Sequence, residues 1–338
     1  MPLNPSELIS ILLPVRNAAA YLAECLSSII RQSDPNWELL VVNDHSTDQS
    51  NTILQQWAAR EPRIKVLQNE GRGIIKALRL AFAQSQGQLI TRMDADDLMP
   101  PHKLQRLRAA LQQAGPGHLS TGWVRYFSEG TLGDGYLRYQ NWLNDLMGSG
   151  RSYEEIYREC VVPSPCWMVY RQDLLRCQAF DPNIYPEDYD LCFRFYQQQL
   201  RIQSVPEVLH LWRNHPERAS RNDPHYADQR FFELKLHYFQ KLEYHPERPL
   251  LLWGAGKKGK LMARLLQKAK MPFHWLTNNE KKIGQQIYGL PLLPQAQLPS
   301  FQNPLIIVCV AGPEEQKEIR LTLEKLQLYP GRHYFFFC

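Results

Sequence analysis

The feature that most constrains the fold is the regular alternation of short apolar runs and helical patterns through the first hundred residues. Four runs rich in Ile, Leu and Val are separated by segments whose apolar residues recur at helical spacing. The runs span residues 9–13, 39–42, 64–67 and 89–93. This βαβαβαβ order is typical of a parallel sheet covered by helices. We therefore expect an α/β domain in this part of the chain.

Polar residues follow each of these predicted strands. In open parallel sheets, ligands bind beyond the carboxyl ends of the strands, so these residues are functional candidates before any family is considered. They are Arg16 and Asn17, then Asp44, then Arg72, and then Asp94, Asp96 and Asp97. We expect them to converge on one edge of the sheet.

The densest cluster of charge is the segment from Asp94 to Asp97, with three carboxylates in four positions directly after a predicted strand. Packing such charges together is unfavourable unless a cation or hydrogen-bond donors compensate, and a hard divalent ion is a natural partner. Alternation along an extended segment places Asp94 and Asp96 on one side and Asp97 on the other. The alternative is that Asp96 or Asp97 only caps the helix predicted around Leu104.

Two further acidic positions each have two interpretations. Asp44 could accept a hydrogen bond from a ribose hydroxyl or a base N–H, or it could build a turn and helix cap together with Ser46 and Asp48. Glu187 and Asp188 precede a helical pattern, where the helix dipole favours acids. In the functional alternative, this acidic pair supplies a general base that takes a proton from an attacking hydroxyl.

Residues 116–186 lack regular periodicity and are rich in Gly, Tyr and Trp, which indicates a variable half of the same domain. Aromatic rings in this segment could stack against a sugar, but we expect a core role for most of them. They are Trp123, Tyr126, Trp142 and Trp167. A connecting helix is predicted over 230–242, and two prolines at 246 and 249 bracket a domain boundary.

A second βα unit opens with a predicted strand at 250–253 and a GxGxxG pattern at Gly254, Gly256 and Gly259. Between a strand and a helix, this pattern lets backbone amides approach a phosphate. Where an NAD-binding fold needs an acid for the ribose, the chain offers neutral residues from Thr277 to Asn279. About 90 residues is half a dinucleotide fold. Structural support, regulation and nucleotide binding all remain open for this unit.

Charge and cysteine usage narrow the classes of protein further. The net charge is +5, and the basic residues are scattered instead of forming runs, which argues against nucleic acid as a partner. Seven cysteines without a CxxC pair favour neither a disulfide framework nor a zinc site, and indicate a reducing, cytoplasmic environment. No apolar stretch approaches the about 20 residues of a membrane span. Peripheral association with the inner face of a membrane that carries the acceptor stays open.

Four short motifs occur together and in order, and as a set they resemble the inverting glycosyltransferase family 2, which has the GT-A fold. The resemblance covers residues 8–222. The motifs are Pro14 to Asn17, Val42 to Asp48, Arg92 to Asp97 and Glu187 to Leu191.

The resemblance implies a role for each acid. Asp44 would contact the nucleotide base, Asp94 the ribose, and Asp96 the Mg²⁺ or Mn²⁺ ion that bridges the diphosphate. Asp188 would be the general base, with Glu187 beside it in the catalytic motif. A single displacement at the anomeric carbon then inverts its configuration.

The resemblance also implies further contacts to the donor. Pro14, Arg16 and Asn17 belong to the first nucleotide-sugar motif. His215 stands where the family often carries a further ligand to the metal or the diphosphate, and we group it with Asp96 and Asp97 as candidate metal ligands. Arginine forks match phosphate oxygens, so Arg72 and Arg213 are candidates for the diphosphate. Surface roles are the alternative for the histidine and both arginines.

One departure from the family pattern concerns the turn at Asp44. Asn43 and His45 stand where the family often has aspartate and glycine. A histidine in the place of the glycine could alter the turn that aims Asp44.

Taken together, the sequence predicts a GT-A domain over 1–222, a helical linker over 223–248 and a small Rossmann-like α/β domain over 249–338. The predicted activity is a metal-dependent hexosyl transfer from a nucleotide sugar, a UDP-sugar, to a carbohydrate or lipid-linked acceptor in polysaccharide, lipopolysaccharide or glycoconjugate synthesis. Two alternatives are an NAD(P)-linked sugar oxidoreductase and a catalytically inactive GT-A-like binding protein.

Overall fold

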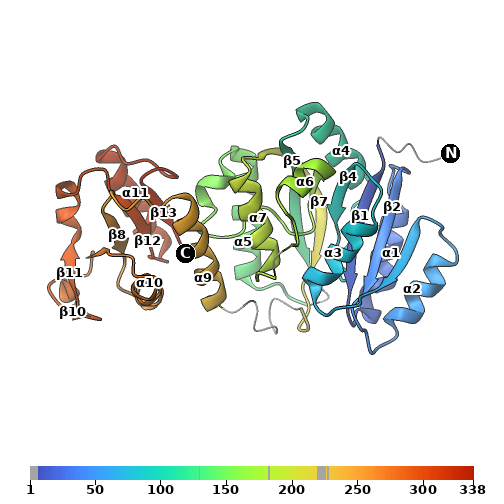
Figure 1. The fold of residues 1–338 in the computed structure, drawn as a ribbon, viewed down its shortest axis with the longest axis horizontal. Helices are drawn as coiled ribbons and strands as arrows, with labels where there is room; N and C mark the ends of the chain where they lie inside the picture. The colour runs from blue at the N-terminus through green and yellow to red at the C-terminus, as the bar shows by residue number, and fades with distance from the viewer. Residues whose placement is uncertain (1–6, 129, 182, 219–225, 227) are drawn as a thin grey trace. The chain divides into compact units, whose positions relative to one another are not determined.

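The structure is a computed structural model that describes residues 7–128, 130–181, 183–218, 226 and 228–338. Its contacts divide the chain into two compact units. One comprises Met1–Ser152 and Val161–Asn222, and the other comprises Tyr153–Cys160 and Asp223–Cys338. Residues 219–225 and 227, which include the end of the predicted GT-A domain and the start of the predicted linker, lie outside the described residues. Figure 1 shows the elements of both units.

The first unit is built on a seven-stranded sheet with the order β3-β2-β1-β4-β6-β5-β7. Its elements in chain order are β1 (Ile9–Val15), α1 (Ala19–Ile30), β2 (Trp37–Asn43), α2 (Ser50–Ala58), β3 (Ile64–Gln68), α3 (Ile74–Gln84), β4 (Leu89–Arg92), α4 (Lys103–Ala114), β5 (His118–Phe127), α5 (Asp134–Ser149), β6 (Trp167–Tyr170), α6 (Arg171–Arg176), α7 (Glu187–Gln197) and β7 (Arg201–Arg213). The alternation predicted for the first hundred residues is confirmed.

Alternate residues of the central strands pack into different layers. Ile11 and Leu39 belong to a core cluster that also takes residues from α1 and α4, including Leu22 and Leu104. The neighbouring positions point to the other face because successive strand side chains alternate, and this face is covered by α3, which contacts β1 and β2. The central strands are therefore buried on both faces, as their high content of Ile, Leu and Val indicates.

Residues 116–186 are more regular than their sequence indicates. They form the ten-residue strand β5, the sixteen-residue helix α5, strand β6 and helix α6. Strand β5 buries Ser120, Thr121 and Gly122, so it lacks the apolar run by which the earlier strands are recognised. The prediction of an irregular segment was wrong because tertiary packing, and not hydrophobic periodicity, determines these elements.

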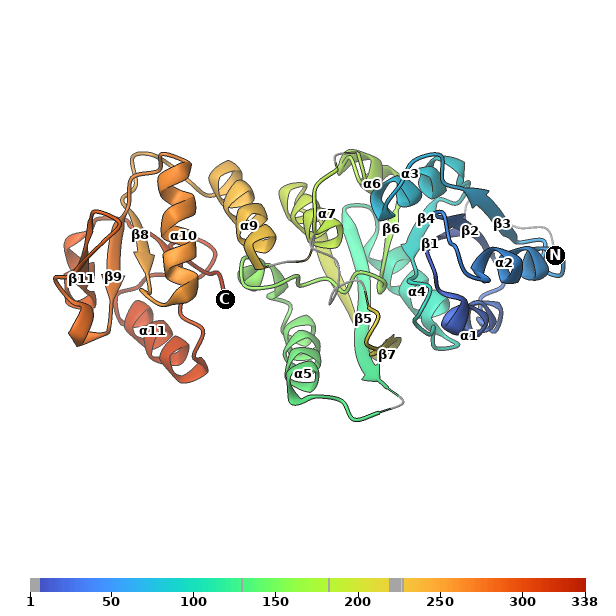
Figure 2. The same cartoon turned by 90° about the horizontal axis from the view of Figure 1, so that it is seen from below.

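The second unit carries a six-stranded sheet with the order β10-β11-β9-β8-β12-β13. Its helices and strands are α9 (Asp228–Leu242), β8 (Leu250–Trp253), α10 (Lys257–Lys268), β9 (His274–Thr277), β10 (Gln286–Ile287), β11 (Leu290–Pro294), β12 (Leu305–Val308), α11 (Pro313–Lys325) and β13 (Tyr334–Phe336). Ile319 of α11 packs with Leu251 and Trp253, whereas α10 contacts β8 and α9 (Figure 2). None of the helices in the described ranges of either unit is long and apolar enough to cross a membrane.

Candidate functional site

The direction of the strands brings the carboxyl ends of most strands of the first unit to one edge. Strands β1, β2, β3 and β4 are parallel, β6 is antiparallel to β4 and to β5, and β5 is parallel to β7. All of these strands except β6 therefore end at the same edge. The polar residues that follow β1, β2, β3 and β4 therefore lie at one edge of the sheet, as expected.

The turn after β2 holds Asp44 in a network of donors. Asp44 is buried, and its Oδ1 accepts a hydrogen bond from Asn69 Nδ2 at 2.6 Å. The backbone N–H of Gly73 donates to both carboxylate oxygens at 3.1 and 3.0 Å. Gly73 has a φ of +96°, which strains any residue with a side chain, so glycine is required for this contact.

His45 lies in the tight turn that follows β2 and Asp44. The residue adopts a left-handed φ of +54°, the conformation that glycine adopts with less strain. Its Nε2 lies 2.6 Å from the carbonyl oxygen of Gly71, which ties the turn to the loop before α3. The contact with Gly71 thus stabilises His45 in a conformation that glycine would adopt with less strain.

The first motif is joined to the turn after β2. Asn17, with a φ of +49°, accepts a hydrogen bond from Thr47 N at 2.8 Å and donates its own N–H to Ser46 Oγ at 3.1 Å. Pro14 lies half-buried in β1, and Arg16 and Arg72 are exposed at the same edge as Asp44. The structure thus provides two exposed cations there.

Arg92, the last residue of β4, links two of the predicted acids. Its guanidinium is buried and lies 3.0 Å from Asp94 Oδ1, and its Nη1 lies 3.1 Å from Glu187 Oε1. The Glu187 side chain is only 4% exposed. Because its carboxylate is committed to this buried ion pair, Glu187 fits a positioning role that holds α7 against the loop after β4. The catalytic role predicted for Glu187 beside Asp188 stays a prediction.

Arg92→Met is expected to lower the free energy of unfolding by about 3–5 kcal/mol, because it removes the cation from a buried carboxylate. Denaturant titration measures this change. Arg106→Met is the matched control, since the Arg106–Glu207 pair is exposed, with side chains 53% and 46% accessible, and such pairs contribute at most about 1 kcal/mol. Equal destabilisation by the two variants would contradict the role assigned to Arg92.

Asp97 points into the protein, away from the position expected of a metal ligand. The side chain is 1% exposed, with Oδ2 2.9 Å from His210 Nε2 and Oδ1 2.8 Å from the backbone N–H of Arg213. Burial and the neighbouring charge of Asp94 raise the pKa of Asp97 to about 7. Both oxygens are occupied by partners within the protein, so its prediction as a metal ligand is corrected. Asp97 instead joins the loop after β4 to strand β7.

A buried lysine completes this connection. Lys103 Nζ lies 3.2 Å from His210 Nδ1 and 2.5 Å from the carbonyl oxygen of Pro165. A protonated lysine can only donate, so His210 accepts at Nδ1 and donates from Nε2 to Asp97. Burial and the charge of Lys103 lower the pKa of His210, which keeps the ring neutral. The His210 ring therefore links Lys103 to Asp97 and is held in one tautomer by these two contacts.

Asp96 and His215 form the pair that could hold a metal ion. His215 Nε2 lies 2.9 Å from Asp96 Oδ2, and Arg213 Nε donates to the backbone carbonyl of Asp96 at 2.8 Å. Two ligand atoms that each lie about 2.1 Å from one divalent ion are separated from one another by a distance similar to the 2.9 Å between these two side chains. His215 Nδ1 is buried without a hydrogen-bond partner in the described chain. No group of three or more His, Cys, Asp or Glu side chains fit to hold a metal occurs among the described residues.

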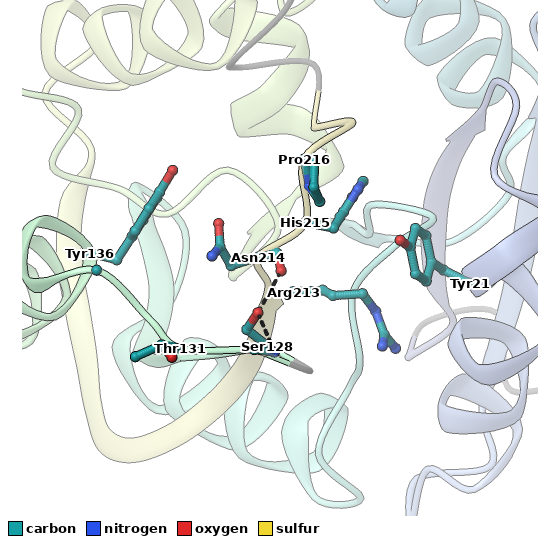
Figure 3. Close-up of a pocket in the computed structure, with 10 residues that line it drawn as sticks. Tyr21, Ser128, Thr131, Tyr136, Arg213, Asn214, His215 and Pro216 are labelled. Atoms are coloured by element: carbon teal, nitrogen blue, oxygen red, sulfur yellow. Dashed lines mark hydrogen bonds between the residues drawn. The ribbon is translucent and has the colours of Figure 1, made fainter.

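A pocket of about 480 Å³ lies beside this pair (Figure 3). Its walls come from the end of β7 and the residues that follow it, from the loop after β5, and from helices α1 and α5. The labelled residues are Tyr21, Ser128, Thr131, Tyr136, Arg213, Asn214, His215 and Pro216. Sequence reasoning missed the members from α1 and the β5 loop. A strand prediction over 118–127 would have identified Ser128 by the same rule that identified Asp44.

The aromatic residues considered for sugar stacking belong to the core or its margin. Tyr126 and Trp167 are buried, and Trp123 and Trp142 pack partly buried against the main core cluster. The core role expected for most of them is confirmed. Tyr21 and Tyr136, which line the pocket, present the aromatic faces at this site.

Asp188 lies in the first turn of α7 and is partly buried. Its Oδ1 accepts a hydrogen bond from the N–H of Tyr189 at 2.8 Å. Burial and the neighbouring charge of Glu187 raise the pKa of Asp188 to about 7, although the positive charge of Arg92 acts to lower this pKa. A carboxylate with this pKa is matched to proton transfer near neutral pH.

In the second unit, packing explains two of the three glycines of the GxGxxG pattern. A Cβ on Gly254 would lie 2.6 Å from the carbonyl oxygen of Cys309, and one on Gly259 would lie 1.9 Å from that of Gly254. Gly256, before the first residue of α10, has open space around it. Asn278, near the position of the ribose-binding acid, accepts a hydrogen bond from the indole of Trp253 at 2.6 Å.

Comparison with known proteins gives a consistent result. The model of the family described as glycosyl transferase family 2 matches residues 10–178. The glycosyltransferase GlyG of Streptococcus pneumoniae serotype 4 is 33% identical over 218 residues, which are 62% of this chain and 71% of that protein. An uncharacterized glycosyltransferase of Haemophilus influenzae is 27% identical over 223 residues, 63% of this chain and 67% of that protein.

Among solved structures, S. aureus TarS 1–349 in complex with UDP-GlcNAc is similar in fold. The TM-score is 0.53 at 17% identity, over 77% of this chain and 71% of that one. At this identity the likeness concerns the fold alone.

Proposed function

The chain belongs to glycosyltransferase family 2 and has the GT-A fold, and on this premise we propose that it transfers a hexose from a UDP-sugar to an acceptor hydroxyl. The observation that carries the proposal is the convergence of the Asp96–His215 pair and Asp188 at one edge of the sheet. A transferase needs both a site for the leaving diphosphate and a base for the acceptor. The TarS structure of similar fold holds a nucleotide sugar, which supports this class of donor.

The order of the strands supports an orientation for the donor. The base and ribose would lie over β2, β1 and β4, near Asp44 and Asp94, with Pro14 and Asn17 beneath them. Arg16 and Arg72 are exposed there and would pair with phosphate oxygens. The sugar would then extend toward β5 and β7, where the pocket lies.

Asp96 and His215 would hold a Mg²⁺ or Mn²⁺ ion, with diphosphate oxygens and water as the remaining ligands. Two protein ligands suffice for an ion that is bound together with substrate phosphates. When bound, the ion would neutralise charge that develops on the leaving diphosphate. Arg213 would hold the loop that carries Asp96 in place, since its backbone N–H donates to Asp97 and its side chain donates to the carbonyl of Asp96.

Asp188 would act as the general base. Its carboxylate accepts the proton of the acceptor hydroxyl while the oxygen attacks the anomeric carbon and the bond to the diphosphate breaks. A single displacement inverts the configuration at that carbon. Arg92 and Glu187 hold α7 in place, and the backbone N–H of Tyr189 orients the carboxylate of Asp188.

The pocket beside His215 would take the acceptor or the transferred sugar, with Tyr21 and Tyr136 as aromatic faces. An acceptor in polysaccharide, lipopolysaccharide or glycoconjugate synthesis, either a carbohydrate or a lipid-linked glycan, fits the family. We propose a cytoplasmic protein that associates peripherally with the membrane in which such an acceptor is anchored.

The rate of transfer is expected to rise with pH through about 7 and then to level off. Asp188 accepts a proton only when ionised, and burial beside Glu187 raises its pKa to about 7, so protonation at lower pH removes the base. The measurement is kcat/KM for UDP-sugar turnover at saturating metal across this range. A profile that is flat between about pH 5 and 8 would contradict Asp188 as the base.

Calorimetry with UDP, GDP and dTDP, each with and without Mn²⁺ or Mg²⁺, tests the proposed donor site. UDP is expected to bind in the presence of metal and much more weakly without it. Failure of all three nucleotides to bind would exclude the donor site and favour an inactive GT-A-like binding protein. Binding of NAD(P)H without metal would favour the oxidoreductase alternative.

A further inference from the structure

Positive charge is concentrated in one part of the chain. Residues 249–338 contain 12 Lys and Arg, 5 Glu and no Asp, a net charge of +7. The whole chain carries +5, so residues 1–248 carry a net charge of −2. The second α/β unit is therefore strongly basic, although the basic residues look scattered along the sequence. Such an asymmetry indicates an anionic partner for the basic part.

Helix α10 collects much of this charge on one face. Lys257, Lys260, Arg264 and Lys268 recur at intervals of three and four residues, so they lie within one narrow stripe along the helix. All four are exposed, whereas Met262 and Leu266 are buried on the opposite side of the helix. These four residues are the basic stripe. At a rise of about 1.5 Å per residue, it is about 16 Å long.

Among the residues that the structure describes, no acidic side chain pairs with the basic stripe. Helix α10 contains no Asp or Glu. None of the four cations takes part in an ion pair within the part of the chain that the structure describes. Helix α11 packs Ile319 and Leu323 in the core cluster with β8 and β12. Its basic residues are interspersed with four acids, Glu314, Glu315, Glu318 and Glu324. The unneutralised charge is therefore a property of the α10 side.

An exposed tyrosine stands next to the basic stripe. Tyr288 and Gly289 form the two-residue turn between β10 and β11, with φ of +52° and +78°. The Tyr288 ring is 38% exposed, and the guanidinium of Arg264 lies 4.8 Å from its centroid. Gln267 of α10 donates to the Tyr288 carbonyl at 2.9 Å, which fixes the turn against the helix. The surface thus combines a row of cations with one amphipathic ring.

We propose that the basic stripe and Tyr288 form a docking surface for an anionic phospholipid membrane. A row of exposed cations is attracted to the negative potential of such a leaflet. Tyrosine suits the boundary between head groups and acyl chains, because its ring is apolar and its hydroxyl is polar. A nucleic acid would also attract the cations, but its charged backbone offers no apolar layer to the ring. The surface belongs to the second unit, whereas the residues proposed for transfer belong to the first.

Binding of the full chain to lipid vesicles tests this surface. The wild-type protein is expected to sediment with vesicles of phosphatidylcholine that contain one third phosphatidylglycerol, and to stay in solution with phosphatidylcholine alone. The variant Lys260→Gln, Arg264→Gln, Lys268→Gln is expected to bind on the order of 100-fold more weakly, since each cation near the surface contributes about a factor of five. About 1 M salt should release the wild-type protein, because the attraction is screened.

The matched control neutralises three exposed basic residues elsewhere in the same unit, Lys317→Gln, Lys325→Gln and Arg332→Gln. This variant has the same net charge and is expected to bind vesicles nearly as well as the wild type. Equal loss in both variants, equal binding to neutral and anionic vesicles, or tighter binding to duplex DNA than to the vesicles would each overturn the proposal. The thermal unfolding midpoint and the UDP binding of the stripe variant, measured in parallel, are expected to match those of the wild type. A failure to bind UDP would therefore count against the transferase proposal and not against the membrane surface.

A second variant tests the aromatic contribution. Tyr288→Asn keeps the left-handed turn, since asparagine tolerates a positive φ, but it removes the ring. It is expected to weaken vesicle binding a few-fold while leaving the salt dependence unchanged, because the four cations remain. A loss of salt dependence in this variant would contradict the assignment of the electrostatic attraction to the cations and of the apolar contact to Tyr288.

Discussion

Alanine in place of Asp96 is expected to abolish the metal dependence of UDP binding and to lower the rate of transfer by about a thousandfold, equivalent to ~4 kcal/mol of transition-state stabilisation. Asp96 is the one carboxylate of the cluster after β4 whose side chain meets His215, at 2.9 Å. Asp97 cannot replace it, because both of its oxygens are engaged in the protein interior. Calorimetric titration of UDP with and without Mn²⁺ measures the first effect, and initial rates measure the second.

Two further variants calibrate this result. Asp145→Ala removes an exposed acid from α5 and should leave both readouts unchanged. His215→Gln should weaken the metal dependence without removing it, because Asp96 remains. Undiminished metal-dependent binding of UDP by the Asp96 variant would exclude this residue as a ligand. Tight binding of UDP to the wild-type protein without any metal would exclude the metal site itself.

The part of the fold that the sequence predicted well is the part in which strands are buried on both faces. Strands β1, β2 and β4 each contain several Ile, Leu or Val residues, so hydrophobicity located them. Strand β5 buries hydroxyl groups, with Thr121 Oγ1 donating to the Cys166 carbonyl at 2.6 Å. Such a strand depends on partners 45 residues away, and no local pattern reveals it.

The candidate site shows a similar division. Sequence spacing identified the edge at which the acids gather, and strand alternation set Asp97 apart from Asp94 and Asp96, but neither could identify the partners of the buried acids. Asp97 pairs with His210 and Glu187 with Arg92, and both partners are distant in the sequence. The left-handed conformation of His45 could not be foreseen either, because histidine rarely adopts it and the contact with Gly71 stabilises it here.

Asparagine in place of Asp188 is expected to lower transfer by about a thousandfold or more while UDP binding stays at the wild-type level. The substitution keeps the size of the side chain but removes its ability to accept a proton. Binding should survive because the proposed donor contacts come from Asp44, Asp94, Asp96 and His215. Single-turnover rates and calorimetric UDP titration, on the same protein preparation, separate the two effects.

The same variant is expected to be at least as stable as the wild type at pH 8. Burial and the charge of Glu187 raise the pKa of Asp188 to about 7 in the folded protein, so its ionisation costs stability as pH rises from the unfolded value near 4 through 7. Asparagine is never ionised and escapes this cost. Glu187→Gln is the contrasting variant, because it breaks the buried pair with Arg92 and should lose stability. A fall in stability or in UDP affinity that parallels the lost activity of Asp188→Asn would mean that the residue maintains the fold or holds the donor. A stable, UDP-binding and inactive variant would leave proton transfer as the role of Asp188.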